Sequence, residues 1–241
     1  MIAIRKMRWN IAAWPVNCLC NLFNAGLLFG GQWDDFGLAN EENPLLYADT
    51  VTGEVIAFVA NDDPVVGHLD PYLFEVLGDI RRLLRATFGT ANELTLALSG
   101  TGTSGMEAAI VNLVEPGAKV AVLVNGYFCE RLAEMARRQG AEVVRLERPW
   151  GEAFEDDDAR SFILQERPAV VAFVHGETST GVLQPGEAIC AAAHEVGALA
   201  IGDCVTSLGN VPVEVDATGI DIAYSCSQKG LGCVPGLAPI T

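Results

Sequence analysis

Apolar residues recur along this chain with two different periods. From Pro71 to Gly89 they fall at spacings of three and four, which predicts an amphipathic helix with Gly89 as its C-cap. Beyond it, short apolar runs alternate with segments of helical periodicity. The runs predict strands at Leu94–Leu98, Lys119–Val124, Glu142–Leu146, Ala169–Val174, Ala198–Ile201 and Ile222–Ser225. The segments between them predict helices at Ser104–Val114, Phe128–Gln139, Asp158–Gln165 and Gly186–Val196.

Such alternation predicts an α/β fold, in which a doubly wound, mostly parallel sheet carries helices on both faces. In these sheets ligands bind beyond the carboxyl ends of the strands. Polar side chains that follow the predicted strands are therefore the first candidates for a functional site.

The first part of the chain is hard to interpret. Basic residues at positions 5, 6 and 8 precede an apolar run from Trp9 to Gly31, which fits a signal peptide or an organellar presequence. Four asparagines and Pro15 interrupt that run, so it is too polar for a membrane span. We treat residues 1–60 as a poorly readable extension, with a mis-called gene start as an alternative, and residues 61–241 as the major domain.

Composition excludes several functional classes. Of the 241 residues 50% are hydrophobic, enough for a large core, and the net charge is −16 without a basic cluster. This argues against nucleic-acid partners and anionic membranes. The seven cysteines are scattered, so neither a disulfide framework nor a metal site is indicated. Reduced thiols, and hence a cytoplasmic location, fit best.

A phosphate cradle is predicted at Ser99–Gly105, between a strand and a helix. Small residues let backbone amides approach an anion, hydroxyls add donors, and the helix supplies the positive end of its dipole. Gly100–Gly105 also fits the G-x-G-x-x-G pattern of a dinucleotide site. The following strand, however, ends in Asn125 instead of the expected acid. A tight turn without a ligand is the third interpretation.

Three further stretches follow predicted strands. Tyr127 and Phe128 could stack on a planar ligand, although such aromatics are more often core. The run His175–Gly181 is polar after an apolar strand, so its buried hydroxyls and carboxylate would need partners that a ligand can supply. Asp203 ends a buried strand, where a charge calls for a cationic partner, either a protein base or a protonated ligand ring.

Lys229 is the one charged residue after Asp221, and it stands among Ser, Gly and Cys. We expect a dry, crowded environment there, which favours the neutral amine as a nucleophile towards carbonyls. The alternative is a surface lysine in a glycine-rich loop. His68, in the predicted loop Pro64–Asp70, is either a satisfied loop histidine or a catalytic group.

These groups together suit pyridoxal 5′-phosphate. The cofactor has a phosphate, a ring face, a ring hydroxyl, a basic ring nitrogen and an aldehyde. The chain offers a cradle, an aromatic side chain, hydroxyls, an acid and a lysine at one edge of the predicted sheet.

Four stretches resemble the class V aminotransferases. They are Ser99–Ala109, His175–Pro185, Asp203–Gly209 and Ser225–Leu231, and the resemblance extends over roughly Pro64 to Thr241. The nearest branch is that of the alanine–glyoxylate and serine–glyoxylate (serine–pyruvate) aminotransferases, which have the fold-type I pyridoxal-phosphate transferase architecture.

The resemblance implies a role for each residue that matches the family's motifs. Lys229 would form the Schiff base with the cofactor and then move a proton, and Asp203 would keep the ring nitrogen protonated. Phe128 would stack on the ring and Val205 would pack on its other face. The remaining cofactor contacts would be made by Thr101, Gly102, Thr103 and Gln228 at the phosphate and by Thr178 at the ring hydroxyl.

The chain departs from the family pattern at both ends. It stops at Thr241, soon after the lysine, so the small C-terminal domain and its substrate-binding arginine are expected to be missing. No counterpart of the family's Gly-Pro-rich substrate loop is recognisable in residues 1–60. The resemblance also implies a homodimer with its sites at the interface.

The expected function is transfer of an amino group from alanine or serine to glyoxylate or pyruvate. One alternative is another class V enzyme, such as an aminoethylphosphonate aminotransferase. A desulfurase fits less well, because Ser227 and Gln228 stand where that group has a histidine before the lysine. An inactive cofactor-binding remnant and a nicotinamide dinucleotide-binding domain are the alternatives from other classes.

Overall fold

The computed structural model describes residues 45–48, 55–58 and 69–241. The chain falls into two compact units, Met1–Glu75 and Val76–Thr241. In the first unit, strands β1 (Leu45–Ala48) and β2 (Val55–Phe58) form an antiparallel pair. Most of the extension at residues 1–60, and the candidate His68, lie outside the described residues.

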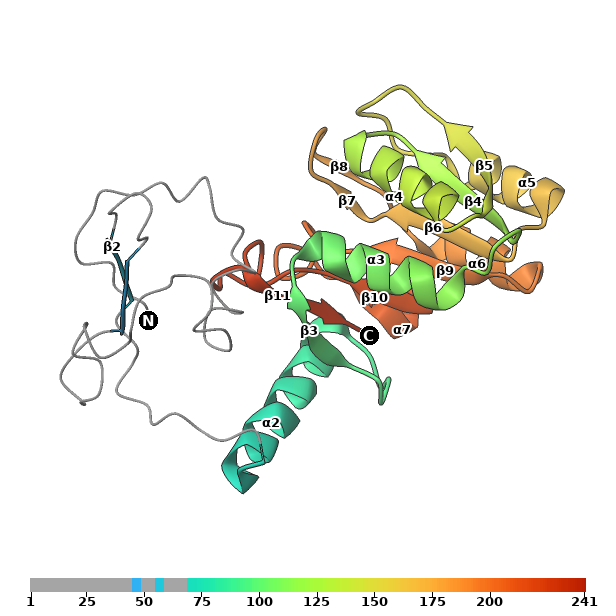
Figure 1. Ribbon diagram of the computed structural model, residues 1–241. Helices are drawn as coiled ribbons and strands as arrows, with labels where there is room; N and C mark the ends of the chain where they lie inside the picture. Colours follow the sequence, from blue (N-terminus) through green and yellow to red (C-terminus); the bar gives the residue numbers. More distant parts are fainter. Residues whose placement is uncertain (1–44, 49–54, 59–68) are drawn as a thin grey trace. The chain divides into compact units, whose positions relative to one another are not determined.

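A seven-stranded sheet forms the centre of the second unit (Figure 1). Its spatial order is β3-β11-β10-β9-β6-β4-β5. The strands are β3 (Leu96–Gly100), β4 (Lys119–Val124), β5 (Glu142–Glu147), β6 (Val170–Val174), β9 (Leu199–Asp203), β10 (Ile222–Tyr224) and β11 (Gly236–Ile240). Within this sheet β11 is antiparallel to both of its neighbours, and the other pairs are parallel. Asp203 pairs with Val174 on one side and with Tyr224 on the other, so three strands end level.

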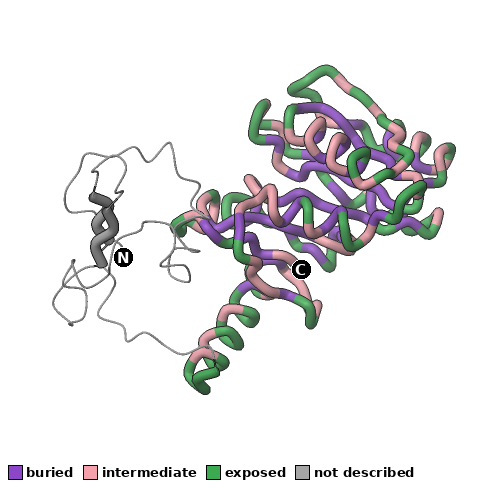
Figure 2. Tube along the Cα trace, in the orientation of Figure 1, coloured by how far each residue is buried: buried purple, intermediate pink, exposed green. Residues whose placement is uncertain are grey.

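Helices cover both faces of the sheet because side chains alternate along the buried strands. Val120 and Val122 of β4 pack in one apolar cluster with helices α3 (Gly102–Leu113) and α4 (Tyr127–Arg138). Ala121 and Leu123 of β4 pack in the other, with α2 (Pro71–Phe88), α5 (Asp156–Glu166), α6 (Glu187–Glu195) and α7 (Val215–Thr218). Figure 2 shows the central strands of the sheet as largely buried, and burial is nearly complete along β4, β6 and β9. The predicted doubly wound α/β fold is confirmed.

Some elements differ from those expected. The sequence predicted neither β11 nor the hairpin of β7 (Gly176–Glu177) and β8 (Val182–Leu183). The strand expected at 94–98 lies at 96–100, because pairing with β11 fixes its register from Gly100–Gly236 to Leu96–Ile240. Leu94, the first residue of the expected strand, lies outside β3 and is 73% exposed.

Three further observations concern only the described part of the chain. None of its helices has both the length and the apolar character that a membrane crossing requires. Its histidines, cysteines and acids form no group of three or more that could hold a metal ion. The five cysteines within it, at positions 129, 190, 204, 226 and 233, are free thiols.

Candidate functional site

One cavity of about 160 Å³ brings the candidate residues together. It is lined by Thr101, Gly102, Thr103, Met106, Phe128, Thr178, Asp203, Val205, Cys226, Gln228 and Lys229. All nine residues named as cofactor contacts from the sequence are among them, although they come from separate segments of the chain. What each residue does there stays a prediction.

The first turn of α3 forms one wall of this cavity. The chain turns at Gly100, whose φ of 149° favours glycine, and the carbonyl of Thr101 then accepts the amides of Ser104 and Gly105 at 2.8 and 3.1 Å. A Cβ on Gly102 would lie 2.8 Å from Cγ2 of Val205, so glycine allows this turn to approach Val205 closely. The first amides of a helix have no partner within it, which makes this wall suited to an anion.

The carboxylate of Glu177 fixes the start of α4. Its Oε2 accepts the amides of Phe128 at 3.0 Å and Cys129 at 3.2 Å, and its Oε1 accepts the amide and hydroxyl of Ser179. Glu177 is 1% exposed and carries negative charge to the positive end of the helix dipole. The sequence expectation that a ligand would satisfy this carboxylate is wrong, because the protein backbone satisfies it.

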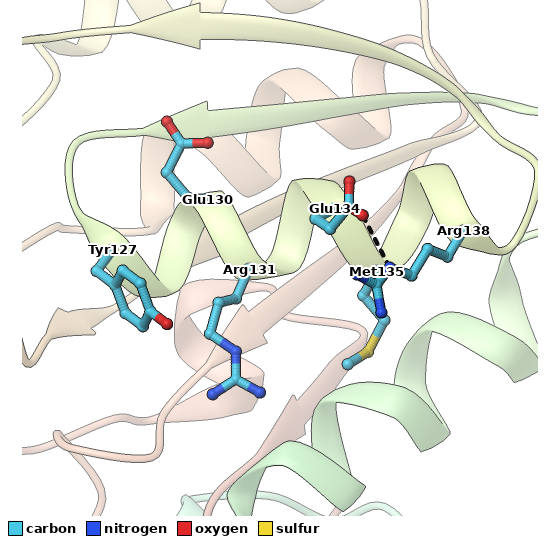
Figure 3. Close-up of a pocket in the computed structure, with 6 residues that line it drawn as sticks. All are labelled: Tyr127, Glu130, Arg131, Glu134, Met135 and Arg138. Carbon is cyan, nitrogen blue, oxygen red and sulfur yellow. Dashed lines mark hydrogen bonds and ion pairs between the residues drawn. The ribbon is translucent and has the colours of Figure 1, made fainter.

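Two neighbouring aromatic residues at the start of α4 have different surroundings. The half-buried ring of Phe128 lines the cavity, whereas Tyr127 is 50% exposed and lines a separate surface hollow on α4 (Figure 3). Their ring centroids lie 5.4 Å apart with the planes at 87°, an edge-to-face contact. Only Phe128 of the two is therefore placed to contact a ligand in the cavity.

Asp203 is the buried acid of the site. Its carboxylate accepts the Tyr224 hydroxyl at 2.8 Å and the Val205 amide at 2.9 Å. Burial raises its pKa from 3.8 to about 6, against the lowering effect of these two hydrogen bonds. Among the described residues no Lys, Arg or His nitrogen lies within 4.0 Å of it, so the cationic partner expected from the sequence is not a protein base.

Lys229 lies on the turn after β10 and is exposed. The dry, crowded environment expected for it is wrong for this chain, because Lys229 lines the cavity but is exposed to solvent. The turn itself is tightly packed: a Cβ on Gly230 would lie 2.2 Å from the carbonyl oxygen of Leu208. Next to the lysine, Oε1 of Gln228 is buried and has no hydrogen-bond partner among the described atoms.

Thr178 also lines the cavity. Thr178 follows β7 and its Oγ1 is hydrogen-bonded to Oγ1 of Thr206, and Thr178 itself is exposed. Asn125, which stands where a dinucleotide site would have an acid, is buried, and its Nδ2 donates to the carbonyl of Glu152 at 2.9 Å. It is occupied within the protein and does not line the cavity.

Sequence reasoning missed four residues that form or support the site. Met106 and Cys226 line the cavity, Tyr224 holds Asp203, and Arg131 donates to Thr103. Met106 stands three residues after Thr103 on α3, so helical spacing could have indicated it, whereas the contact of Arg131 with another helix leaves no such signal. Tyr224 and Cys226 are on and just after a buried strand, where nothing in the local pattern distinguishes them from core.

Comparison with known proteins identifies relatives of this chain. The sequence model of the family described as aminotransferase class V matches residues 54–237. An alanine–glyoxylate aminotransferase of Rattus norvegicus is 39% identical over 177 residues, which cover 73% of this chain and 43% of the relative. An (S)-ureidoglycine–glyoxylate transaminase of Bacillus subtilis (strain 168) is 39% identical over 178 residues, covering 74% and 43%.

A solved structure of a similarly named enzyme is also similar to this chain. The crystal structure of an alanine–glyoxylate aminotransferase from Nostoc sp. has a TM-score of 0.73 and 51% identity, and the match covers 75% of this chain and 48% of that one. The chain thus spans less than half the length of the relatives named here.

Proposed function

Because the chain belongs to the class V aminotransferase family, we propose that it is the cofactor-binding part of a pyridoxal-phosphate-dependent aminotransferase. The observation that carries this proposal is the single cavity that collects the nine residues named above. A dinucleotide site, the alternative suggested by Gly100–Gly105, has no support from the relatives.

The residues present fit pyridoxal phosphate. The first turn of α3, with Thr101, Gly102 and Thr103, would receive the phosphate. Asp203 would hold the protonated ring nitrogen, the cation that this buried carboxylate does not find among the described residues. The unpartnered Oε1 of Gln228 leaves a buried acceptor for a donor in the cavity.

Further contacts would fix the plane of the ring. Phe128 and Val205 both line the cavity and would pack on opposite faces, and Thr178 would donate to the ring hydroxyl. The Phe128 ring is held in place because its helix begins on the buried Glu177. This rigidity matters because a reacting group must be oriented before the reaction occurs.

Bound pyridoxal phosphate supplies an aldehyde that condenses with amines and a ring that withdraws electrons. We assign two roles to Lys229, which lines the cavity and is exposed. Its amine would hold the aldehyde of the cofactor, and when free it would be the base that carries the proton of the substrate Cα. Asp203 would stabilise the positive ring nitrogen throughout.

The substrates we propose are alanine or serine as amino donor and glyoxylate or pyruvate as acceptor. Both curated relatives named above are glyoxylate transaminases, with alanine in one and (S)-ureidoglycine in the other. Glyoxylate is therefore the better supported acceptor. We further propose that the protein acts in glyoxylate metabolism as a homodimer, which sedimentation of the cofactor-loaded chain would test.

Absorbance and reduction test cofactor binding. The chain mixed with pyridoxal phosphate is expected to show a band near about 420 nm that borohydride removes while it links the cofactor to Lys229. Lys229→Ala should lose the band. Lys119→Ala, at a lysine on β4 that pairs with Glu166, should keep it. If the two variants behave alike, the assignment of Lys229 is wrong.

A half-reaction separates an aminotransferase from an inactive cofactor-binding fragment. L-Alanine added to the loaded chain without an acceptor should release pyruvate in an amount stoichiometric with bound cofactor. Glyoxylate added afterwards should be converted to glycine. A chain that binds the cofactor but releases no pyruvate from alanine, and no oxo acid from serine, would contradict the proposed activity of this chain.

A further inference from the structure

Arg131 links the two helices that meet at the cavity. Its Nη2 donates to Oγ1 of Thr103 at 3.2 Å, so a cation on the second turn of α4 reaches the first turn of α3. Thr103 lines the cavity and Arg131 does not. The guanidinium thus acts on the site through the hydroxyl of Thr103.

The positive charge of Arg131 is not neutralised by the acids on its own helix. Glu134 pairs with Arg137 and Arg138, and Glu130 pairs with Arg145. In Figure 3 Arg131 extends to the side of α4 opposite to Glu130. Within the described residues no carboxylate oxygen lies within 4.0 Å of Arg131, although the chain as a whole carries a net charge of −16.

The cavity itself has little positive charge to offer a phosphate. Its charged lining residues are Asp203 and Lys229, and the amine of Lys229 is the group that would react with the aldehyde. The helix end contributes about half an elementary charge, whereas a phosphate monoester carries about −1.5 to −2 at pH 7. Burial raises the pKa of Asp203, and the charge of Arg131 is a small effect in the opposite direction, so the field of Arg131 reaches the cavity.

We propose that Arg131 is a positioning residue for the phosphate of the cofactor. By donating to Oγ1 of Thr103 it leaves the hydroxyl hydrogen of that threonine free to be donated to a phosphate oxygen. Its charge, at a partly buried position, also offsets that of the phosphate. The inference rests on the proposed function, since it requires pyridoxal phosphate as the ligand.

Comparison of two ligands tests this role. The cofactor-free chain is titrated with pyridoxal phosphate and with pyridoxal, which lacks the phosphate, and the dissociation constants are read from absorbance. Arg131→Gln should weaken binding of pyridoxal phosphate about tenfold and change binding of pyridoxal by less than about twofold. Arg131→Lys should restore part of the lost affinity, because it keeps the charge and a donor.

Arg138→Gln is the matched control. Arg138 lies on the same helix and lines the same surface hollow as Arg131, but it pairs with Glu134 at 2.8 Å. Its substitution should change neither dissociation constant. Thr103→Val tests whether Arg131 acts through the hydroxyl of Thr103. In a chain that carries Thr103→Val, Arg131→Gln should reduce the affinity for pyridoxal phosphate much less than it does in the original chain.

The outcomes separate this inference from the proposed function. If the original chain binds neither ligand, the proposed function is wrong. If it binds both and Arg131→Gln weakens both equally, or neither, the positioning role is wrong. Unfolding midpoints of the cofactor-free variants complete the test, because a merely structural role would lower the midpoint and affect the two ligands alike.

Discussion

Oε2 of Glu177 accepts the backbone amide of Phe128 at 3.0 Å, and this one contact joins two motifs separated by 48 residues in the sequence. The carboxylate comes from the β7–β8 hairpin and the amide from the first turn of α4. A Cβ on the preceding Gly126 would lie 2.2 Å from Cγ of Glu177, so glycine is required for the approach. The position of the aromatic wall of the cavity therefore depends on a buried acid that does not itself touch the cavity.

We expect Glu177→Ala to lower the free energy of unfolding by about 2–4 kcal/mol, because two helix amides lose a buried, charged acceptor. Glu177→Gln keeps an oxygen acceptor and should cost less. Urea denaturation of the cofactor-free chain measures both. Glu187→Ala is the control, since this acid is in the first turn of α6 but is exposed, and it should cost no more than about 1 kcal/mol.

A second prediction concerns the close contact between Gly102 and Val205. Gly102→Ala should lower the free energy of unfolding by about 1–3 kcal/mol, because its Cβ would lie 2.8 Å from Cγ2 of Val205. It should also weaken binding of pyridoxal phosphate, since the cavity is small. Adding Val205→Ala should recover part of the stability, and a purely additive double variant would show that the two side chains do not interact.

Gly78→Ala is the matched control for that substitution. Gly78 lies inside α2, and a Cβ there would have nothing within 4 Å. Alanine should stabilise the helix by about 1 kcal/mol through its higher helix propensity. The free energy of unfolding is expected to fall for Gly102→Ala and to rise for Gly78→Ala. This difference distinguishes a packing conflict from a general effect of glycine replacement.

Thiol reactivity offers a test of the core. Burial raises the pKa of Cys129 and Cys190 to about 12 and that of Cys204 still further, whereas Cys233 is exposed. Because the thiolate is the reactive form, among these four described cysteines Cys233 should be labelled by iodoacetamide first and the three buried thiols only on unfolding. Peptide mass spectrometry at intervals measures this order. Early labelling of Cys204 would contradict its burial between the sheet and α6.

The sequence was sufficient to predict the elements whose apolar residues are close together in the chain. Lys119–Val124 was predicted with its observed ends, because every second side chain on each face meets a helix. The antiparallel β11 was missed, since it contains Gly236 and Pro239 and depends on a partner strand more than 130 residues away. Pairing between distant segments leaves no local periodicity.

The candidate site divides in the same way. Side chains that follow strands could be placed at one sheet edge from topology alone, and the structure puts all nine around one cavity. Three aspects could not be predicted. Glu177 binds a helix and not a ligand, Lys229 is exposed, and Arg131 reaches the site through Thr103. Each depends on side-chain direction, which sequence spacing does not determine.

The last prediction follows from the buried carboxylate of Asp203, whose pKa is raised from 3.8 to about 6. Between these two pH values the folded chain holds a proton that the unfolded chain has released. Stability from this group is therefore lost as the pH rises through that window, and the loss is complete above about pH 6. A shift of this size corresponds to about 3 kcal/mol.

Asp203→Asn removes this cost but keeps one acceptor oxygen for the Val205 amide or the Tyr224 hydroxyl. We therefore expect the cofactor-free variant to be more stable than the original chain at pH 8, with a smaller gain at pH 5, as measured by urea denaturation. Asp157→Asn, at an exposed position in α5, controls for the loss of a negative charge. A variant that is less stable at both pH values would show that the two hydrogen bonds outweigh burial.

Asp203→Asn should also weaken binding of pyridoxal phosphate, because a neutral amide cannot compensate a positive ring nitrogen. Loss of binding together with a gain in stability would identify Asp203 as a residue retained for its ligand at the expense of the folded chain.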